Sequence, residues 1–196
     1  MYEKTKPEKK PLKKMPDLQQ TYGKEQIYFT DEMRYGTRTA AKRRWSRQGR
    51  RPVCKVKIGY EWGYLFLALC PANGDLFACY CSHLDKACFK YFTQEFSTHL
   101  QAKAIATSVL LIGDKATAHQ QSLLPDRIHW QSLPTACPEL NPVERFFEEL
   151  RKVLANRIFE DKSQVEHCLT LWLNQYQKQP DRLIQLTQFA WFNHAT

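Results

Sequence analysis

The sequence predicts an α/β domain in which helices flank a mixed β-sheet. Four strand-like runs rich in Val, Ile, Leu, Phe and Tyr lie between residues 25 and 81, and the second half alternates helix-like and strand-like patterns. Antiparallel strands followed by alternating strand and helix are typical of a three-layer α/β domain. At 196 residues and 43% hydrophobic content, the chain is long enough for one such domain with a substantial core.

The N-terminal residues predict a flexible arm and then a first strand. Residues 1–24 carry seven lysines and three prolines with little apolar content, so we expect a basic arm at 1–24 and the folded domain at 25–196. The run "EQIYFTDE" predicts a strand that begins near Ile27 and ends near Asp31. The next segment, from Met33 to Pro52, holds eight Arg and Lys and no acid, which indicates a long basic loop.

Three more strand-like runs follow the basic loop. They are "VCKVKIGY" (53–60), "GYLFLALC" (63–70) and "DLFACYC" (75–81), which together predict a three-stranded meander. Asn73-Gly74 between the second and third runs is a strong hairpin signal.

The second half of the chain changes period. The predicted elements are a helix over 83–101, a buried strand "ATSVLLIGD" that ends at Asp114, a short helix over 115–124, a short strand over 128–134, a helix from Pro142 to about Ile158, a helix from Asp161 and a final helix over 182–192. Asn141, Pro142 and Glu144 fall at the N-cap, N1 and N3 positions of the helix that they begin.

Charge and cysteine content narrow the function classes. Residues 1–58 hold 17 Lys and Arg against 6 Asp and Glu, a net of +11, while residues 59–196 hold 12 against 14, a net of −2. This uneven charge suggests contact with a polyanion such as nucleic acid, although a solubilising tail explains it about as well. Seven cysteines without a CxxC pair, no secretory signal and no apolar run of membrane-spanning length favour a reducing cytoplasm and no membrane contact.

Three acids stand at predicted element ends. Asp31 and Asp114 end strands and Glu144 begins a helix, and the carboxyl ends of strands in an open α/β sheet are where sites assemble. Three converging carboxylates could hold two Mg²⁺ or Mn²⁺ ions for phosphoryl transfer. Each acid alone has an ordinary explanation as a turn residue or a helix-start acid, so periodicity leaves this site open.

The local sequences around these acids resemble a known family. "YFTDE" (28–32), "LLIGDKATAH" (110–119) and "LPTACPELNPVERFFEELRK" (133–152) are similar, in order, to the three motifs of mariner-like DDE transposases of bacterial insertion sequences. The resemblance implies a ribonuclease H-like fold and DNA cleavage and strand transfer in cut-and-paste transposition. It implies that Asp31, Asp114 and Glu144 are the catalytic residues and bind two Mg²⁺ or Mn²⁺ ions.

The resemblance also places residues near the site. His119 matches the motif histidine, Lys115 replaces the usual asparagine, and Glu148 is the fallback ligand one turn beyond Glu144. Family members carry helix-turn-helix domains before the catalytic domain, and this chain has about 26 residues before its first strand. We therefore expect a separately encoded helix-turn-helix subunit or a truncated remnant.

The expected partner is DNA, both transposon ends and target, bound by a homodimer in the bacterial nucleoid. Phosphate contacts are expected from the cations of the basic loop, with Trp45 packing or stacking among them: Arg38, Lys42, Arg43, Arg44, Arg47, Arg50 and Arg51. Two alternatives remain, namely a catalytically silent DNA-binding or regulatory remnant and a stand-alone ribonuclease H-like nuclease.

Overall fold

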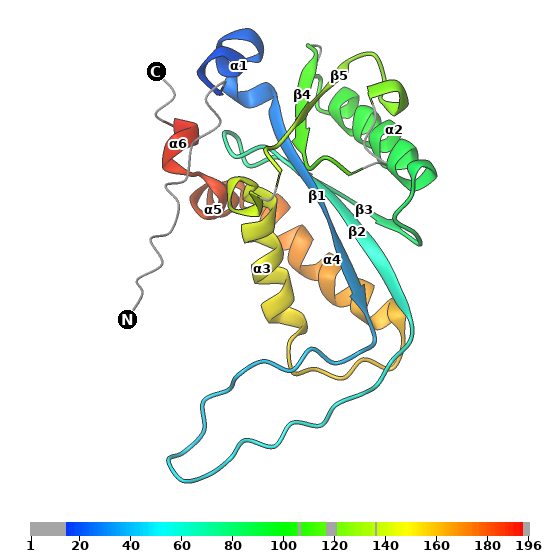
Figure 1. The fold of residues 1–196 in the computed structure, drawn as a ribbon, viewed down its shortest axis with the longest axis vertical. Coiled ribbons are helices and arrows are strands. Elements are labelled where there is room, and N and C mark those ends of the chain that lie inside the picture. Colours follow the sequence, from blue (N-terminus) through cyan, green and yellow to red (C-terminus); the bar gives the residue numbers. More distant parts are fainter. Residues whose placement is uncertain (1–14, 106, 117–120, 136, 194–196) are drawn as a thin grey trace.

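The computed structural model describes residues 15–105, 107–116, 121–135 and 137–193. One mixed sheet forms its centre, with the spatial strand order β3-β2-β1-β4-β5 (Figure 1). The strands are β1 (Ile27–Gly36), β2 (Trp62–Leu69), β3 (Leu76–Cys81), β4 (Val109–Gly113) and β5 (Ile128–Ser132). β1, β2 and β3 are antiparallel neighbours, whereas β1, β4 and β5 run parallel. The prediction of a mixed α/β sheet is confirmed.

Helices cover both faces of this sheet. They are α1 (Met15–Tyr22), α2 (Lys86–Ala102), α3 (Pro142–Leu154), α4 (Lys162–Lys178), α5 (Pro180–Thr187) and α6 (Ala190–Asn193). Short 3₁₀ turns lie at Lys24–Gln26, Gln121–Leu123 and Pro138–Leu140. Of the region predicted as a helix at 115–124, residues 117–120 lie outside the described residues, and the part after them is the 3₁₀ turn. α3 ends at Leu154, four residues before the predicted end.

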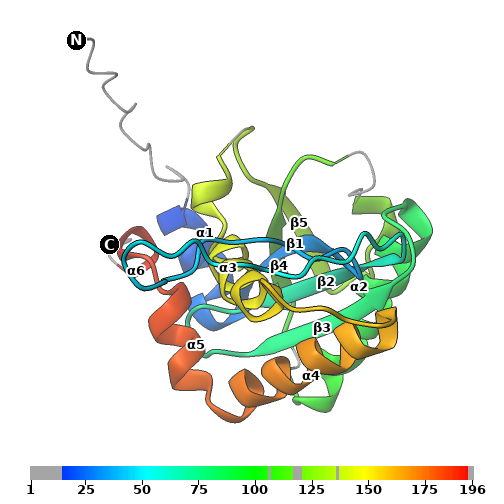
Figure 2. The ribbon, with the colours of Figure 1, turned by 90° about the horizontal axis from the view of Figure 1, so that it is seen from below.

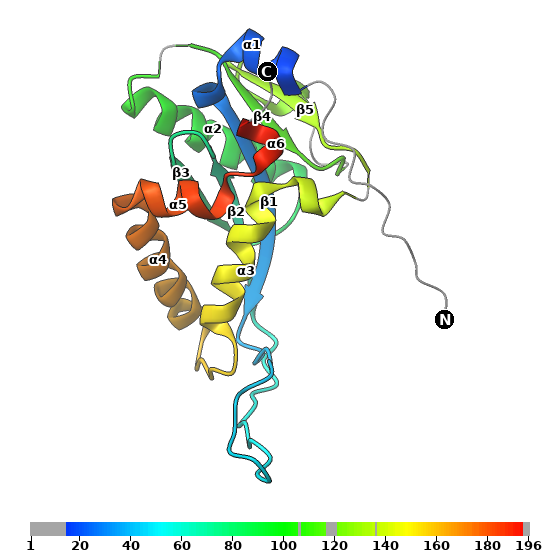
Figure 3. The same ribbon diagram turned by 90° about the vertical axis from the view of Figure 1, so that its left-hand side faces the viewer.

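Alternating strand residues divide the core between the two faces. Ile27 and Phe29 pack into the cluster that contains the apolar stripes of α3, α4 and α5, whereas Tyr28 packs into the cluster under α2. Figure 3 shows α3, α4 and α5 side by side, and Figure 2 shows α4 alongside β3. Because successive side chains of a strand point to opposite faces, both faces of the sheet carry apolar residues that helices bury. The sheet is therefore the middle layer of three.

The first strand is longer than predicted. β1 continues past Asp31 to Gly36 because β2 pairs with it along Phe29 to Gly36. Met33 and Tyr35, which the prediction assigned to the basic loop, are 2% and 4% exposed in the core. Asp31 is thus an internal strand residue and not the end of a strand.

The predicted strand at 53–60 does not form. Residues 37–61 make one long connection between β1 and β2 that extends away from the body (Figure 1). Val53 and Tyr60 are 90% and 80% exposed, so the apolar side chains of this segment have no neighbouring surface to pack against. The antiparallel meander is formed by β1, β2 and β3 instead, with the predicted turn at Asn73-Gly74 between the last two.

The predicted arm is partly a packed helix. Residues 1–14 lie outside the described residues, but residues 15–22 form α1. Met15 is 1% exposed in the core, and the Gln19 side chain donates a 2.7 Å hydrogen bond to the carbonyl of Phe192. Residues 15–22, which the composition assigned to a flexible arm, therefore pack against α6 as part of the folded domain.

Candidate active site

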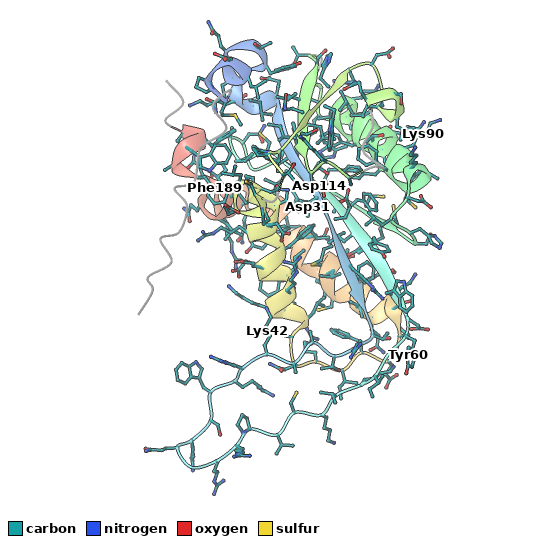
Figure 4. The ribbon with its side chains drawn as sticks, viewed as in Figure 1. Asp31, Lys42, Tyr60, Lys90, Asp114 and Phe189 are labelled. Carbon is teal, nitrogen blue, oxygen red and sulfur yellow. The ribbon has the colours of Figure 1, made fainter. Side chains whose placement is uncertain are left out.

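The pairing of β1 with β4 places two of the three predicted acids side by side. In this parallel pair Phe29 lies opposite Ile112, and Asp31 and Asp114 each follow two residues later, Asp114 directly after the end of β4. Asp31 faces the same side of β1 as Phe29, which packs into the core beneath α3, and both acids line one cleft. Figure 4 shows Asp31 and Asp114 close together at the centre of the sheet.

Close packing fixes the backbone that carries Asp114. A Cβ atom on the preceding residue, Gly113, would lie 2.5 Å from Cη2 of Trp130 and 2.8 Å from Cγ2 of Thr30. A side chain there would force these groups to move, so glycine is favoured at this position. After Gly113 the chain leaves the strand, and the Asp114 carboxylate accepts a 2.9 Å hydrogen bond from the backbone N–H of Ala116.

The third acid comes from the start of α3. Asn141 is the N-cap and its side-chain oxygen accepts from the Val143 N–H at 3.1 Å, with Pro142 at N1, as the sequence predicted. The Glu144 N–H donates to the Asn141 carbonyl at 3.2 Å. Glu144 is therefore held one turn from the point where α3 meets β1.

All three acids line one cleft. Its volume is about 410 Å³, and Asp31, Asp114, Lys115, Asn141 and Glu144 lie on its walls. Asp31 lies on β1, Asp114 directly follows β4, and Asn141 and Glu144 belong to the start of α3, so three segments that are far apart in the sequence form one site. The structure thus brings together Asp31, Asp114, Glu144 and Lys115.

The electrostatics of the cleft centre on Asp31. Burial raises the pKa of its carboxyl to about 7; the backbone N–H of Glu32, which donates to Oδ1 at 2.8 Å, acts in the opposite direction. The nearby carboxylates of Glu32, Glu144 and Asp114 raise this pKa further. A buried acid surrounded by other acids is the arrangement that a bound cation relieves.

The Glu144 carboxylate is paired with an arginine in this structure. Its Oε2 accepts a 3.0 Å hydrogen bond from Nη1 of Arg151, two turns along α3. Over the described ranges, no three His, Cys, Asp or Glu side chains are close enough to hold a single metal ion. The backbones of the three acids converge on the cleft, while the Glu144 carboxylate has a different partner.

The remaining predicted site residues fall in different places. Glu148 lines a neighbouring hollow of about 440 Å³ with Glu139, Glu144 and Phe189, and not the cleft that contains Asp31. His119 lies outside the described residues.

The predicted DNA-binding cations lie on the long β1–β2 connection, beyond the end of α3 in Figure 3, and all seven are exposed: Arg38, Lys42, Arg43, Arg44, Arg47, Arg50 and Arg51. Trp45 in the same connection is fully exposed.

Both limbs of this connection are attached to the turn between α3 and α4. The Asn156 N–H donates to the Ala40 carbonyl, and its side-chain oxygen accepts from the Lys42 N–H, both at 2.9 Å. On the other limb, Nζ of Lys57 donates to the carbonyls of Phe159 and Glu160. Sequence reasoning missed these contacts because partners more than 100 residues apart leave no local signal, although an asparagine with φ of 58° at a helix end is a typical αL residue.

The fold and the cleft define a class of protein. The described sheet and helices superpose on the catalytic domain of Mos1 mariner transposase with a TM-score of 0.57, at 13% identity and with 97% of this chain and 98% of that chain covered. A structure of the Mos1 transposase paired-end complex with the left transposon end matches with a TM-score of 0.63 at 15% identity. This chain is covered completely and spans 66% of that longer chain. The fold is ribonuclease H-like, as predicted.

The family follows from sequence. The model of the DDE superfamily endonuclease family matches residues 26–166, and the chain belongs to this family. It is also 32% identical over 138 residues to the uncharacterized protein y4pE/y4sA of Sinorhizobium fredii, which covers 68% of this chain and 99% of that protein. The chain is therefore a domain of the DDE superfamily endonuclease family with a ribonuclease H-like fold.

Proposed function

We propose that this chain is the catalytic domain of a DNA transposase that cleaves DNA strands and transfers them in cut-and-paste transposition. The observation that carries the proposal is the single cleft lined by Asp31, Asp114 and Glu144, each of which lies in one of the three sequence stretches that resemble the motifs of mariner-like DDE transposases. The proposed catalytic residues are these three acids. Their joint task is to bind the cations that the reaction needs and to hold the scissile phosphate beside them.

The donor set fits divalent cations. Three carboxylates in one cleft offer the oxygen ligands that Mg²⁺ and Mn²⁺ prefer, and the pKa of Asp31 is raised first by burial and further by the neighbouring carboxylates, both of which a bound cation would offset. We assign two ions to Asp31, Asp114 and Glu144, with Glu148 as a replacement ligand. Two such ions, when bound, activate an attacking oxygen and stabilise a leaving oxygen in phosphoryl transfer. Solved Mos1 structures contain Mn or Mg, which supports this choice.

Lys115 has a separate role in this proposal. It is exposed on the wall of the cleft that holds Asp31 and Asp114, and a lysine there can contact a DNA phosphate. His119 is proposed to lie near the same site.

The long β1–β2 connection is the proposed DNA contact. Its exposed cations face solvent on a segment whose two limbs are fixed to the body through Asn156 and Lys57. Because Lys57 is engaged by two carbonyls, we assign phosphate contacts to Arg38, Lys42 and the arginines at 43, 44, 47, 50 and 51. Such contacts orient the duplex without reading its sequence.

The wider assembly is also a proposal. The Mos1 relatives include a paired-end complex and a strand transfer complex, which support transposon ends and target DNA as partners here. We propose a homodimer on DNA, end recognition by a separately encoded helix-turn-helix subunit, and association with the bacterial nucleoid. No helix among the described residues is long and apolar enough to cross a membrane.

One observation favours a second candidate, a catalytically silent DNA-binding remnant. The Glu144 carboxylate pairs with Arg151 and not with the other two acids. A chain that kept this arrangement permanently would bind DNA through its loop and would not cut it.

A nicking assay on supercoiled plasmid separates these candidates. We expect Mn²⁺-dependent nicking by the parent chain, loss of nicking in Asp114→Ala, and full activity in Asp126→Asn, which removes an exposed acid elsewhere. Retained cleavage by Asp114→Ala refutes the assignment of the three acids. A parent chain that binds the plasmid but never nicks it is the silent remnant.

A further inference from the structure

Asn141 forms hydrogen bonds with both β1 and the start of α3, which lie on two sides of the cleft. Its side chain is 3% exposed, and its Nδ2 donates to Oδ2 of Asp31 at 3.2 Å and to the carbonyl of Thr30 at 3.1 Å. Its Oδ1 accepts from the Val143 N–H, and its carbonyl accepts from the Glu144 N–H. One residue therefore bonds the acid on β1 and the backbone of the acid on α3.

Capping alone does not require an asparagine at this position. Serine and aspartate cap helices as well as asparagine does. Serine has too short a side chain to cap α3 and reach β1 together, and an ionised aspartate has no donor for the Thr30 carbonyl or for Asp31. Only an amide of this length accepts from the helix start and donates twice to the strand.

We propose that Asn141 is a positioning residue, which fixes the Asp31 carboxylate relative to Glu144 so that both can bind the same cations. This role rests on the proposed function. Each Asp31 oxygen accepts one described hydrogen bond, from Glu32 or from Asn141, and a carboxylate oxygen has a second lone pair that remains available to a cation. The amide also stabilises a carboxylate that lies among other carboxylates, and it adds no negative charge of its own.

The first test measures the link without metal. Asn141→Ser keeps a capping oxygen and removes both donations to β1, while Asp31→Asn removes the acceptor charge. In EDTA, the melting-temperature changes of the two single variants and the double variant should be non-additive, because Asn141→Ser removes the hydrogen bond to the Asp31 carboxylate and Asp31→Asn removes the charge that strengthens it. Additive changes overturn the inference, whatever the protein does with DNA.

The second test measures the cation site directly. The free Mn²⁺ signal in electron paramagnetic resonance gives the dissociation constant of the parent, of Asn141→Ser and of Asp161→Ala. The last variant is the matched control, because Asp161 caps α4 through the Gln164 N–H and has no contact with the cleft in the described structure. We expect a dissociation constant raised by about 10- to 100-fold in Asn141→Ser, as for other groups that orient metal ligands, and no change in the control.

The outcomes separate the two proposals. A parent that binds Mn²⁺ with the same affinity as Asn141→Ser leaves the proposed function intact and overturns the role of Asn141. Equal weakening in Asp161→Ala shows a general effect of helix destabilisation and also overturns it. A parent that binds no Mn²⁺ overturns the proposed cation site, and with it the positioning role.

Discussion

Replacing Asp31 by asparagine should make the metal-free protein more stable. Burial and three nearby acids raise the pKa of this carboxyl from 3.8 to about 7. A folded-state pKa above the unfolded value means that the folded protein holds the proton more tightly, so the stability due to Asp31 is fully present below about pH 4. It is lost as the pH rises through about 7, where the carboxylate must be ionised in the fold.

The size of the stability gain follows from the difference between the folded and unfolded pKa values of Asp31. About three pKa units at 1.36 kcal/mol each give a penalty of at most about 4 kcal/mol at pH 8 and between about 1 and 2 kcal/mol at pH 5. The new amide in Asp31→Asn cannot accept from both the Glu32 N–H and Asn141, because one of its two polar atoms is a donor, which costs about 1 kcal/mol. The expected net gain is roughly 3 kcal/mol at pH 8 and close to zero at pH 5.

Urea unfolding in EDTA at the two pH values measures this difference. Unchanged m values would show that the variant changes stability and not the extent of unfolding. Asp126→Asn is the control for loss of an exposed acid and should show no comparable gain. Mn²⁺ should stabilise the parent more than Asp31→Asn, because only the parent keeps all three acids. If Asp31→Asn is destabilised equally at pH 5 and pH 8, burial does not penalise the ionised carboxylate in the fold.

Three further outcomes are expected. Asp75→Asn should lower the free energy of unfolding at pH 7 by about 2 kcal/mol, because the pKa of this 8%-exposed carboxylate is lowered to about 2 in the fold. In urea titrations the difference in stability between the variant and the parent should shrink as the pH falls from about 4 toward 2. Gly113→Ala should lower the free energy of unfolding by about 1 to 3 kcal/mol in the same assay, because its Cβ would collide with Trp130. An unchanged urea midpoint would contradict the packing described for the end of β4. Glutamine at the cations of residues 38–51 should flatten the fall of log DNA affinity with log salt by about 0.9 per lost phosphate contact, whereas Lys90→Gln on α2 should not; equal slopes would exclude the loop as the DNA contact.

The elements that the sequence predicted well carry their signal locally. β4 is an unbroken apolar run, as a strand buried on both faces requires, and its end at Gly113 placed Asp114 correctly. The start of α3 was equally clear, because Asn141 and Pro142 occupy positions where their residue types are favoured for known reasons. A hairpin at Asn73-Gly74 was confirmed on the same basis.

The elements that were predicted wrongly depend on distant partners. Residues 53–60 have the alternation and the residue types of a strand, but only single backbone bonds, such as the Thr39 N–H to the Lys57 carbonyl, attach them to the opposite limb. β1 was predicted too short because Asp31 and Glu32 look like a strand end, whereas pairing with β2 carries the strand through them. α1 was missed because its packing partner, α6, is about 170 residues away.

The ion pair between Glu144 and Arg151 is too weak to prevent Glu144 from binding a cation. The two side chains are 34% and 43% exposed, and ion pairs at such positions contribute roughly 0 to 1 kcal/mol. That is small beside the penalty of up to about 4 kcal/mol for an ionised Asp31 with no cation beside it. The backbone of Glu144 is already fixed by Asn141, and those of Asp31 and Asp114 by the pairing of β1 with β4. We therefore propose that a bound cation draws the Glu144 carboxylate away from Arg151 and toward the other two acids, while the backbone of the site stays in place.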